Sequence, residues 1–349
     1  MSNLQIGLAV AGGLVLVGIV AHSAWNSRRS APRQASPEPV PDAALRGTRE
    51  PVFEDTSPGA AIARSGPLPV QVRKPAMDAL IDVIATLALD PSTPAASGDA
   101  AIAAMPATRR VGTKPFAIEG YNLASLVWET PVAGQRYGGF QAGVQLANRQ
   151  GPLNEIEYSE FVVKAQAFAD AMNATAEFPE MRDEVARARE LDQFASAHDA
   201  QLSFTLRARN ASWSPGYVQQ HAARLGFVAG AIAGRMVLPS EVEGAPPLLV
   251  LAFDAQAALA DDPAQSAIRE LNLHLDVAQV DRTEDPFARM QKAAFELASS
   301  MDGVVTDDNA QPLETQTMAT IRQELQSLYD TLEARDLAAG SPLARRLFS

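Results

Sequence analysis

The residue types that usually carry catalysis or bind metal ions are scarce in this chain of 349 residues. It has no cysteine, so disulfides, thiolate nucleophiles and cysteine-based metal sites are excluded. It has four histidines, none in an HxH or HExxH pair, so a zinc site is not expected: His22, His198, His221 and His274. The pairs Asp261-Asp262 and Asp307-Asp308 could hold a divalent cation, but solvated acids in turns explain them more simply.

Motifs of nucleotide-binding proteins and hydrolases are also missing. There is no GxxxxGK[ST] phosphate loop and no GxSxG nucleophile elbow. The net charge of −12 and the pI near 4.9 repel nucleic acid and anionic lipid surfaces alike. We therefore expect no enzyme, no cofactor, no metal, no small-molecule substrate and no nucleic-acid partner. The alternative, an enzyme with a dispersed acidic site, would require a concave polar pocket with converging carboxylates.

The N-terminus carries an apolar segment long enough to cross a bilayer. Residues 6–21 have no charge, and the roughly 22 residues around them would form a helix of about 33 Å. Arg28 and Arg29 follow the segment and no basic residue precedes it. This asymmetry predicts an uncleaved transmembrane anchor over residues 1–26, with the N-terminus outside and the rest of the chain in the cytoplasm. The alternative is a cleaved signal peptide, since residues 21–24 resemble a cleavage site.

The chain after the anchor divides into a linker and two folded stretches. Residues 27–76 are rich in proline and lack hydrophobic periodicity, which predicts a disordered tether with an end-to-end distance of roughly 40 Å. Folded modules are expected over residues 77–198 and 199–338, followed by a flexible tail over residues 339–349.

Both folded stretches show the element order β-α-β-β-β-α-β-α. In the first, strands are predicted at 79–89, 114–121, 126–130, 140–146 and 175–178, with helices at 97–105, 161–172 and from 179. In the second, strands are predicted at 200–210, 227–238, 248–253, 271–277 and 304–305, with helices at 215–226, 287–301 and 318–332. Residues 168–172 and 297–301 are locally similar and end equivalent helices. We therefore hypothesise a tandem duplication, which requires the same strand order in both sheets.

Two segments of the second stretch resemble a known family. Residues 302–308 (DGVVTDD) between two helices, and residues 226–230 (GFVAG) at the entry to a strand, are similar to segments of the ZipA C-terminal domain. ZipA ties the bacterial division protein FtsZ to the inner membrane, and the predicted anchor and tether match this family in kind. The resemblance implies an α+β fold, a split β-α-β antiparallel sheet with helices on one face. Typical relatives lack a module like residues 77–198, which could be a degenerate copy serving as a spacer, a second binding face or an intramolecular partner.

The resemblance also implies a binding site without catalytic groups. The family binds the FtsZ C-terminal tail in a shallow apolar groove on the open face of the sheet. The family's contact positions correspond here to Ile232, Gly234, Val250, Ala252, Asp254, His274 and Asp276. In the first strand, Leu202, Phe204 and Leu206 have the character of core residues, which leaves Ser203, Thr205 and Arg207 for the groove.

Several of these positions have a second explanation. Ile232 and Val250 could be ordinary core residues. His274 could be a solvated residue of the sheet face, although the family has an aromatic side chain there, which implies stacking. Asp254 and Asp276 are more polar than an apolar groove prefers; they could pair with a basic residue of the tail or weaken binding.

The predicted function is a cell-division adaptor of the bacterial inner membrane. It would tether FtsZ filaments at the division septum, with many anchored grooves binding the many tails of one polymer. The alternative is a membrane-anchored scaffold that binds a different division or envelope protein.

Overall fold

A computed structural model describes residues 32–35, 77–92, 95–242, 244–307, 310–313 and 315–349. The chain divides into two compact units: an N-terminal unit that ends at Ser196, and a C-terminal unit from Ala197 to Ser349 with which residues 32–35 are grouped. The predicted anchor, residues 1–26, and most of the predicted tether lie outside the described residues. No helix within the described ranges is long and apolar enough to cross a membrane.

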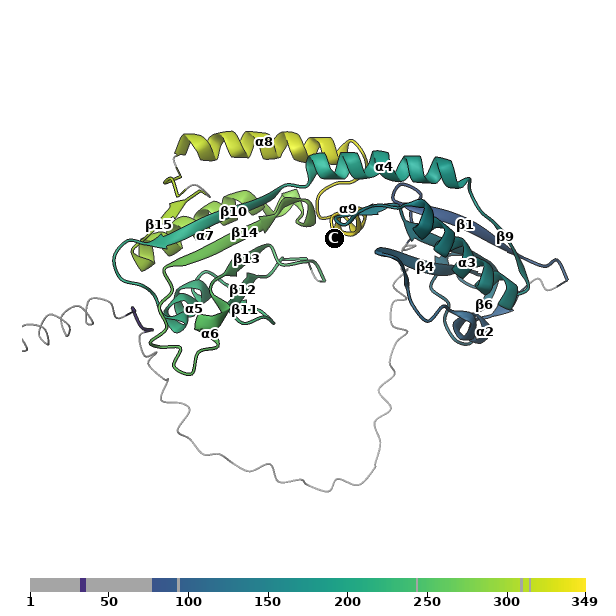
Figure 1. Ribbon diagram of the computed structural model, residues 1–349, viewed down its shortest axis with the longest axis horizontal. Coiled ribbons are helices and arrows are strands. Elements are labelled where there is room, and N and C mark those ends of the chain that lie inside the picture. The colour runs from purple at the N-terminus through teal and green to yellow at the C-terminus, as the bar shows by residue number, and fades with distance from the viewer. Residues whose placement is uncertain (1–31, 36–76, 93–94, 243, 308–309, 314) are drawn as a thin grey trace, which may run out of the picture. The chain divides into compact units, whose positions relative to one another are not determined.

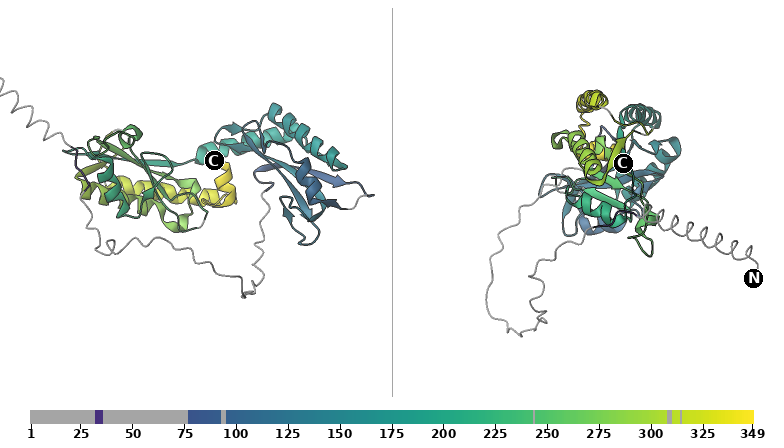
Figure 2. Two further views of the ribbon diagram at one scale, coloured as in Figure 1. Left: turned by 90° about the horizontal axis from the view of Figure 1, so that it is seen from below. Right: turned by 90° about the vertical axis from the view of Figure 1, so that its left-hand side faces the viewer.

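The N-terminal unit is an antiparallel sheet with a long helix packed on one face (Figures 1 and 2). Its strands are β1 (Asp82–Leu89), β2 (Ala96–Ser97), β3 (Arg110–Val111), β4 (Lys114–Asn122), β5 (Trp128–Glu129), β6 (Arg136–Gln145), β7 (Ala147–Asn148), β8 (Gly151–Pro152) and β9 (Ala174–Glu177). Its helices are α2 (Gly98–Ala104), α3 (Glu155–Ala171) and α4 (Met181–His198). The main strand order is β3-β4-β6-β1-β9, with β2 beside β6 and β5 beside β4.

Aromatic side chains hold α3 against this sheet. Phe168 of α3 meets Phe140 of β6 edge to face at 5.2 Å, and Phe161 meets Phe116 of β4 at 6.1 Å. Alternate residues of β6, including Ala142 and Val144, are fully buried on the same side. The intervening residues, such as Gln141 and Gly143, therefore belong to the opposite face of the sheet.

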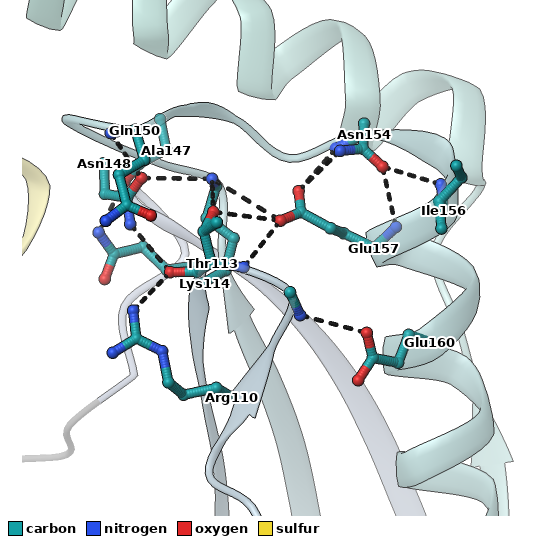
Figure 3. A network of polar contacts seen from close by, with 12 residues as sticks. Arg110, Thr113, Lys114, Ala147, Asn148, Gln150, Asn154, Ile156, Glu157 and Glu160 are labelled. Atoms are coloured by element: carbon teal, nitrogen blue, oxygen red, sulfur yellow. Dashed lines mark hydrogen bonds and ion pairs between the residues drawn. The ribbon is translucent and has the colours of Figure 1, made fainter.

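A buried lysine anchors a polar network at the start of α3 (Figure 3). The Lys114 ammonium donates to Thr113 Oγ1 at 2.7 Å and to Asn148 Oδ1 at 3.2 Å, and lies 4.0 Å from the Glu157 carboxylate. Glu157 also completes a capping box with Asn154 at the N-terminus of α3. Burial lowers the pKa of Lys114, while the nearby carboxylate of Glu157 acts to raise it.

The C-terminal unit repeats the plan of an antiparallel sheet with helices (Figure 1). Its strands are β10 (Gln201–Ala208), β11 (Val228–Ala229), β12 (Arg235–Leu238), β13 (Leu249–Ala252), β14 (Glu270–Asp276) and β15 (Gly303–Thr306). Its helices are α5 (Pro215–Ala223), α6 (Ala255–Ala258), α7 (Pro286–Met301), α8 (Thr315–Glu333) and α9 (Pro342–Leu347), with 3-10 turns η2 (Val277–Gln279) and η3 (Arg282–Glu284). The strand order is β11-β12-β13-β14-β10-β15.

The core of this unit lies between α7 and the sheet. Phe204 of β10 meets Phe287 of α7 edge to face at 6.2 Å, and Leu206 is fully buried beside it. Leu251 and Leu273 continue this buried layer across β13 and β14. The predicted α+β class with antiparallel sheets is thus confirmed in both units.

The two sheets share the order of five strands, since β3-β4-β6-β1-β9 corresponds to β12-β13-β14-β10-β15, while β11 has no counterpart on this path. Strand β1 lies between β6 and β9 in the first sheet, and β10 lies between β14 and β15 in the second. Next to these, β4 follows β6 and β13 follows β14. The registers match as well. Thr86 pairs with Gln141 and Glu177 in the first sheet, and Thr205 pairs with Asn272 and Thr306 in the second.

The helix that precedes the last strand ends in the same way in each unit. Asn173 follows α3 and Met172 with φ 52°, and Asp302 follows α7 and Met301 with φ 56°. Both residues are in the left-handed conformation, which Asn and Asp tolerate better than other non-glycine residues.

Two predicted elements differ from the structure. The strand predicted over residues 227–238 is a hairpin: β11 and β12 are joined by a turn that ends at Gly234, whose φ is +74°. A side chain at Gly234 would lie 2.5 Å from the carbonyl oxygen of Phe253, so the close approach requires glycine.

The predicted flexible tail, residues 339–349, instead contains α9 and packs into the C-terminal unit. Leu347 and Phe348 are almost fully buried. The side chain of Gln279 donates to the carbonyl oxygens of Arg345 and Phe348, at 3.2 and 2.7 Å. Apolar residues at the end of a chain are buried only where the fold provides a surface that fits them. The sequence of the tail does not reveal this surface, because distant residues form it.

Helix α5 of the C-terminal unit carries a largely buried histidine. His221 of α5 is 9% exposed, stacks on Tyr217 at 4.4 Å and contacts Ser300 Oγ through Nδ1 at 3.1 Å. Burial lowers the pKa of His221 below its ordinary value of 6.5, and the charges of Arg224 and Arg33 act in the same direction.

We expect His221→Gln to reduce the loss of stability on acidification. The unfolded chain takes up the proton more readily than the folded unit, so this histidine lowers the free energy of unfolding as the pH falls below about 6.5. Urea unfolding of the full chain at about pH 7.5 and 5.5 measures the effect. The unfolding free energy of the C-terminal unit should fall less in the variant; an equal fall would contradict the assignment.

Candidate functional site

The face of the C-terminal sheet opposite α7 carries a row of side chains that runs across four strands. His274 of β14 pairs with Ser203 of β10 on one side and with Val250 of β13 on the other. Val250 in turn pairs with Val237 of β12. Ser203, Val237 and Val250 are half-buried and His274 is exposed, whereas their neighbours along each strand contribute to the core. The alternation of a strand thus puts this row on the outer face.

A groove of about 610 Å³ lies over one end of this row. Of the residues predicted from the sequence, Ser203, Val250, His274 and Asp276 line it. Pro246 and Pro247 lie at the entry to β13 and add apolar wall. The volume and the largely apolar lining suit a short peptide segment.

Polar pairs occupy the sheet face beyond the groove. Thr205 donates to Asn272 Oδ1 at 2.9 Å, and Arg207 forms an ion pair with Glu270 at 3.3 Å. Because Thr205 and Arg207 already have partners within the sheet, their polar groups are less available to a bound peptide than the hydroxyl of Ser203. Ala252 is half-buried between Arg235 and Asn272 in the same layer.

Three of the predicted residues lie outside the strands of the sheet. Ile232 and Gly234 are in the turn between β11 and β12, and Ile232 is 58% exposed. Asp254 lies just after β13, where its side chain caps α6 by accepting from the amide of Gln256 at 2.9 Å. In β12 the residues opposite Ala252 and Val250 are Arg235 and Val237.

The groove therefore includes residues that the sequence did not indicate: Arg235, Pro246 and Pro247. Gly230 and Gly234 at the two ends of a short apolar stretch are a turn signal that could have revealed the hairpin. Nothing local to the two prolines indicates that they wall a groove, because their position depends on how β13 lies against β14.

The equivalent place in the N-terminal unit is covered. Gly143 pairs with Ile84 and Ala117, as His274 pairs with Ser203 and Val250. A side chain at Gly143 would collide with the sulfur of Met77, which is only 7% exposed. Met77 thus packs on the outer face of this sheet at the point where the other sheet has its groove.

Within the described parts of the chain, no three His, Asp or Glu side chains come together in a way that could hold a metal ion. The groove itself offers only Asp276 as a carboxylate among its lining residues. Its chemistry is that of recognition.

Comparison with known proteins gives one family and no individual relative. No curated protein matches the chain. The family model described as "ZipA, C-terminal FtsZ-binding domain" matches residues 256–324, from α6 into α8. This family is a protein-binding domain and not an enzyme family. The match confirms, over residues 256–324, the resemblance to the ZipA family that the sequence predicted.

Proposed function

We propose that the chain tethers FtsZ filaments to the inner membrane and thereby stabilises the division ring. The groove on the outer face of the C-terminal sheet would bind the FtsZ C-terminal tail. The observation that carries the proposal is that this groove, lined by Ser203, Val250 and His274, opens in the unit that contains the ZipA family match. The proposal includes a single-pass anchor in residues 1–26, a periplasmic N-terminus and a cytoplasmic C-terminal unit at the septum.

The mechanism requires only modest affinity for a single tail. A polymer presents many tails, and several anchored chains that bind one filament raise the effective concentration of each remaining groove. An open, shallow groove with few polar anchors suits this regime, because individual contacts can exchange while the filament stays attached.

We also propose that the two units arose by duplication and that only the C-terminal unit binds the tail. The shared strand order and registers support the first part. The position of Met77 over Gly143 supports the second, since the equivalent of the groove is occupied by the unit's own side chain. The N-terminal unit would then serve as a spacer or contact another protein.

Binding of a labelled synthetic FtsZ tail peptide to the full chain tests the function. Fluorescence anisotropy is expected to show saturable binding with a stoichiometry of about one peptide per chain, because one groove is open and its equivalent is covered. A scrambled peptide of the same composition is the control. Absence of binding at high micromolar peptide would contradict the proposal, and a stoichiometry of two would contradict the single site.

A further inference from the structure

A short segment near the N-terminus is bound to the C-terminal unit. Residues 32–35, here called the docking segment, lie beside the chain between β10 and α5 (Figure 1, purple). The amide of Arg33 donates to the carbonyl oxygen of Ser212 at 2.7 Å, and the amide of Ser214 donates to the carbonyl oxygen of Arg33 at 2.9 Å. Arg33 thus pairs in parallel with Trp213, which pairs on its other side with Ile268. The segment thus adds a second β-bridge beside the one that joins Trp213 to Ile268.

The Arg33 side chain adds specificity to this backbone pairing. One guanidinium nitrogen donates to Asp302 Oδ2 at 2.8 Å and the other donates to the carbonyl oxygen of Met301 at 3.2 Å. Met301 is the last residue of α7, so the cation lies at a helix C-terminus, where the helix dipole favours positive charge. Only arginine has two separate nitrogens in a planar group that reach both acceptors.

The receiving surface is built from buried and well-connected residues. Trp213 is fully buried, and its indole nitrogen donates to the same Met301 carbonyl at 2.8 Å. Asp302 also accepts from Asn210 at 3.1 Å. This hydrogen bond, together with the charge of Arg33, holds the pKa of Asp302 below its usual range. The carboxylate is therefore charged and oriented to meet a cation.

The docking segment and the groove lie at opposite ends of the sheet. The groove is lined by Gln201 and Ser203 at the start of β10, whereas the docking surface follows the end of β10 at Ala208. Eight residues of extended strand separate these ends by roughly 26 Å. On the other side, the peptide units between Trp25 and Pro32 can span no more than about 25 Å.

We infer that the docking segment binds the end of the C-terminal sheet remote from the groove, and thereby fixes this unit close to the membrane with its groove directed away from the bilayer. The part that concerns the membrane rests on the proposed anchor. Docking shortens the connection between the anchor and the C-terminal unit from the whole predicted tether to the few residues that precede Pro32. The rest of the predicted tether would then form a loop that leads to the N-terminal unit.

Cysteine cross-linking tests the docking, since the chain has no cysteine of its own. The Cβ of Ala35 lies 3.7 Å from the position of a Cβ at Gly216, within the usual range for a disulfide. The full-length double variant Ala35→Cys/Gly216→Cys should therefore form an intramolecular disulfide under mild oxidation. The control is Ala44→Cys/Gly216→Cys, which shares one cysteine and puts the other outside the docking segment. We expect at least tenfold faster closure in the first pair.

Substitutions of the two charged partners test the specificity. Adding Arg33→Ala or Asp302→Asn to the first pair should slow closure toward the control rate, whereas Arg29→Ala, which removes a cation outside the segment, should leave it unchanged. Equal rates for the two cysteine pairs would overturn the inference. Disulfide-linked dimers in place of closed monomers would show that the segment docks on a second chain and would overturn the assignment within one chain.

Binding of the FtsZ tail peptide to the same samples separates this inference from the proposed function. Closing the disulfide in liposome-bound chain should change the peptide affinity by less than about twofold, because the groove opens at the other end of the sheet. A loss of binding on closure would overturn the proposed orientation. Failure of closure with intact peptide binding would overturn docking alone, and closure without any peptide binding would overturn the function alone.

Discussion

Replacing Val250 by aspartate in the full chain is expected to lower the affinity for the FtsZ tail peptide roughly thirtyfold, or about 2 kcal/mol. Val250 lies between Val237 and His274 in the row on the outer face, and it lines the groove. A carboxylate there must lose water when a peptide covers it, and the apolar surface that Val250 offers to the peptide is lost. Fluorescence anisotropy with the labelled peptide measures the change.

The chain offers a matched control in its own N-terminal unit. Ala117 pairs with Gly143 as Val250 pairs with His274, and it is also half-buried. Ala117→Asp should therefore leave peptide binding unchanged. Val250→Thr keeps the shape of the side chain and should cost only a few-fold in affinity. Full affinity in folded Val250→Asp, checked by its unfolding midpoint, would exclude this groove as the tail site.

Replacing Lys114 by alanine is expected to destabilise the N-terminal unit by about 3 kcal/mol. The side chain is 1% exposed, and its ammonium binds Thr113 and Asn148 (Figure 3). Its removal takes the ion-pair partner away from the Glu157 carboxylate and leaves Asn148 Oδ1 with the Gln150 amide as its remaining donor, and it opens a cavity under the β4 strand. Urea unfolding of the full chain measures the loss. We expect one transition for each unit, and the transition of the N-terminal unit should move to lower urea.

Two further variants separate the contributions of charge and volume. Lys114→Met keeps most of the volume, so it should lose less stability than Lys114→Ala. Adding Glu157→Gln to Lys114→Met removes the unpaired carboxylate and should recover part of the loss. Because the groove is in the other unit, none of these variants should change affinity for the tail peptide. A loss below about 1 kcal/mol for Lys114→Ala would show that water already solvates the ammonium.

Local periodicity was sufficient to predict most elements of both units. The alternation around Phe204 and Leu206 placed these residues in the core and left Ser203, Thr205 and Arg207 on the other face, where the structure has them. The helical stripe from Phe287 to Met301 predicted α7. Such patterns survive folding because each strand or amphipathic helix buries one face whatever its neighbours are.

The register of β12 was beyond this reasoning. A continuous apolar stretch predicted one strand over residues 227–238, and the family resemblance named Ile232 and Gly234 within it. A turn that ends at Gly234 divides this stretch into a hairpin, so both residues lie between β11 and β12. Asp254, named from the family resemblance, follows β13 as the predicted end of that strand at residue 253 implied, and its carboxylate caps α6.

The sequence by itself determined the α+β class, the repeated element order and the resemblance to the ZipA family, because periodicity and short motifs depend only on neighbours along the chain. Tertiary structure decided which residues form the groove, since Pro246, Arg235 and His274 meet only when three strands align. It also decided that Met77 covers the equivalent place in the other unit, and that Arg33 reaches Asp302 from the far end of the sequence. Contacts between residues hundreds of positions apart depend on chain topology, which no local pattern encodes.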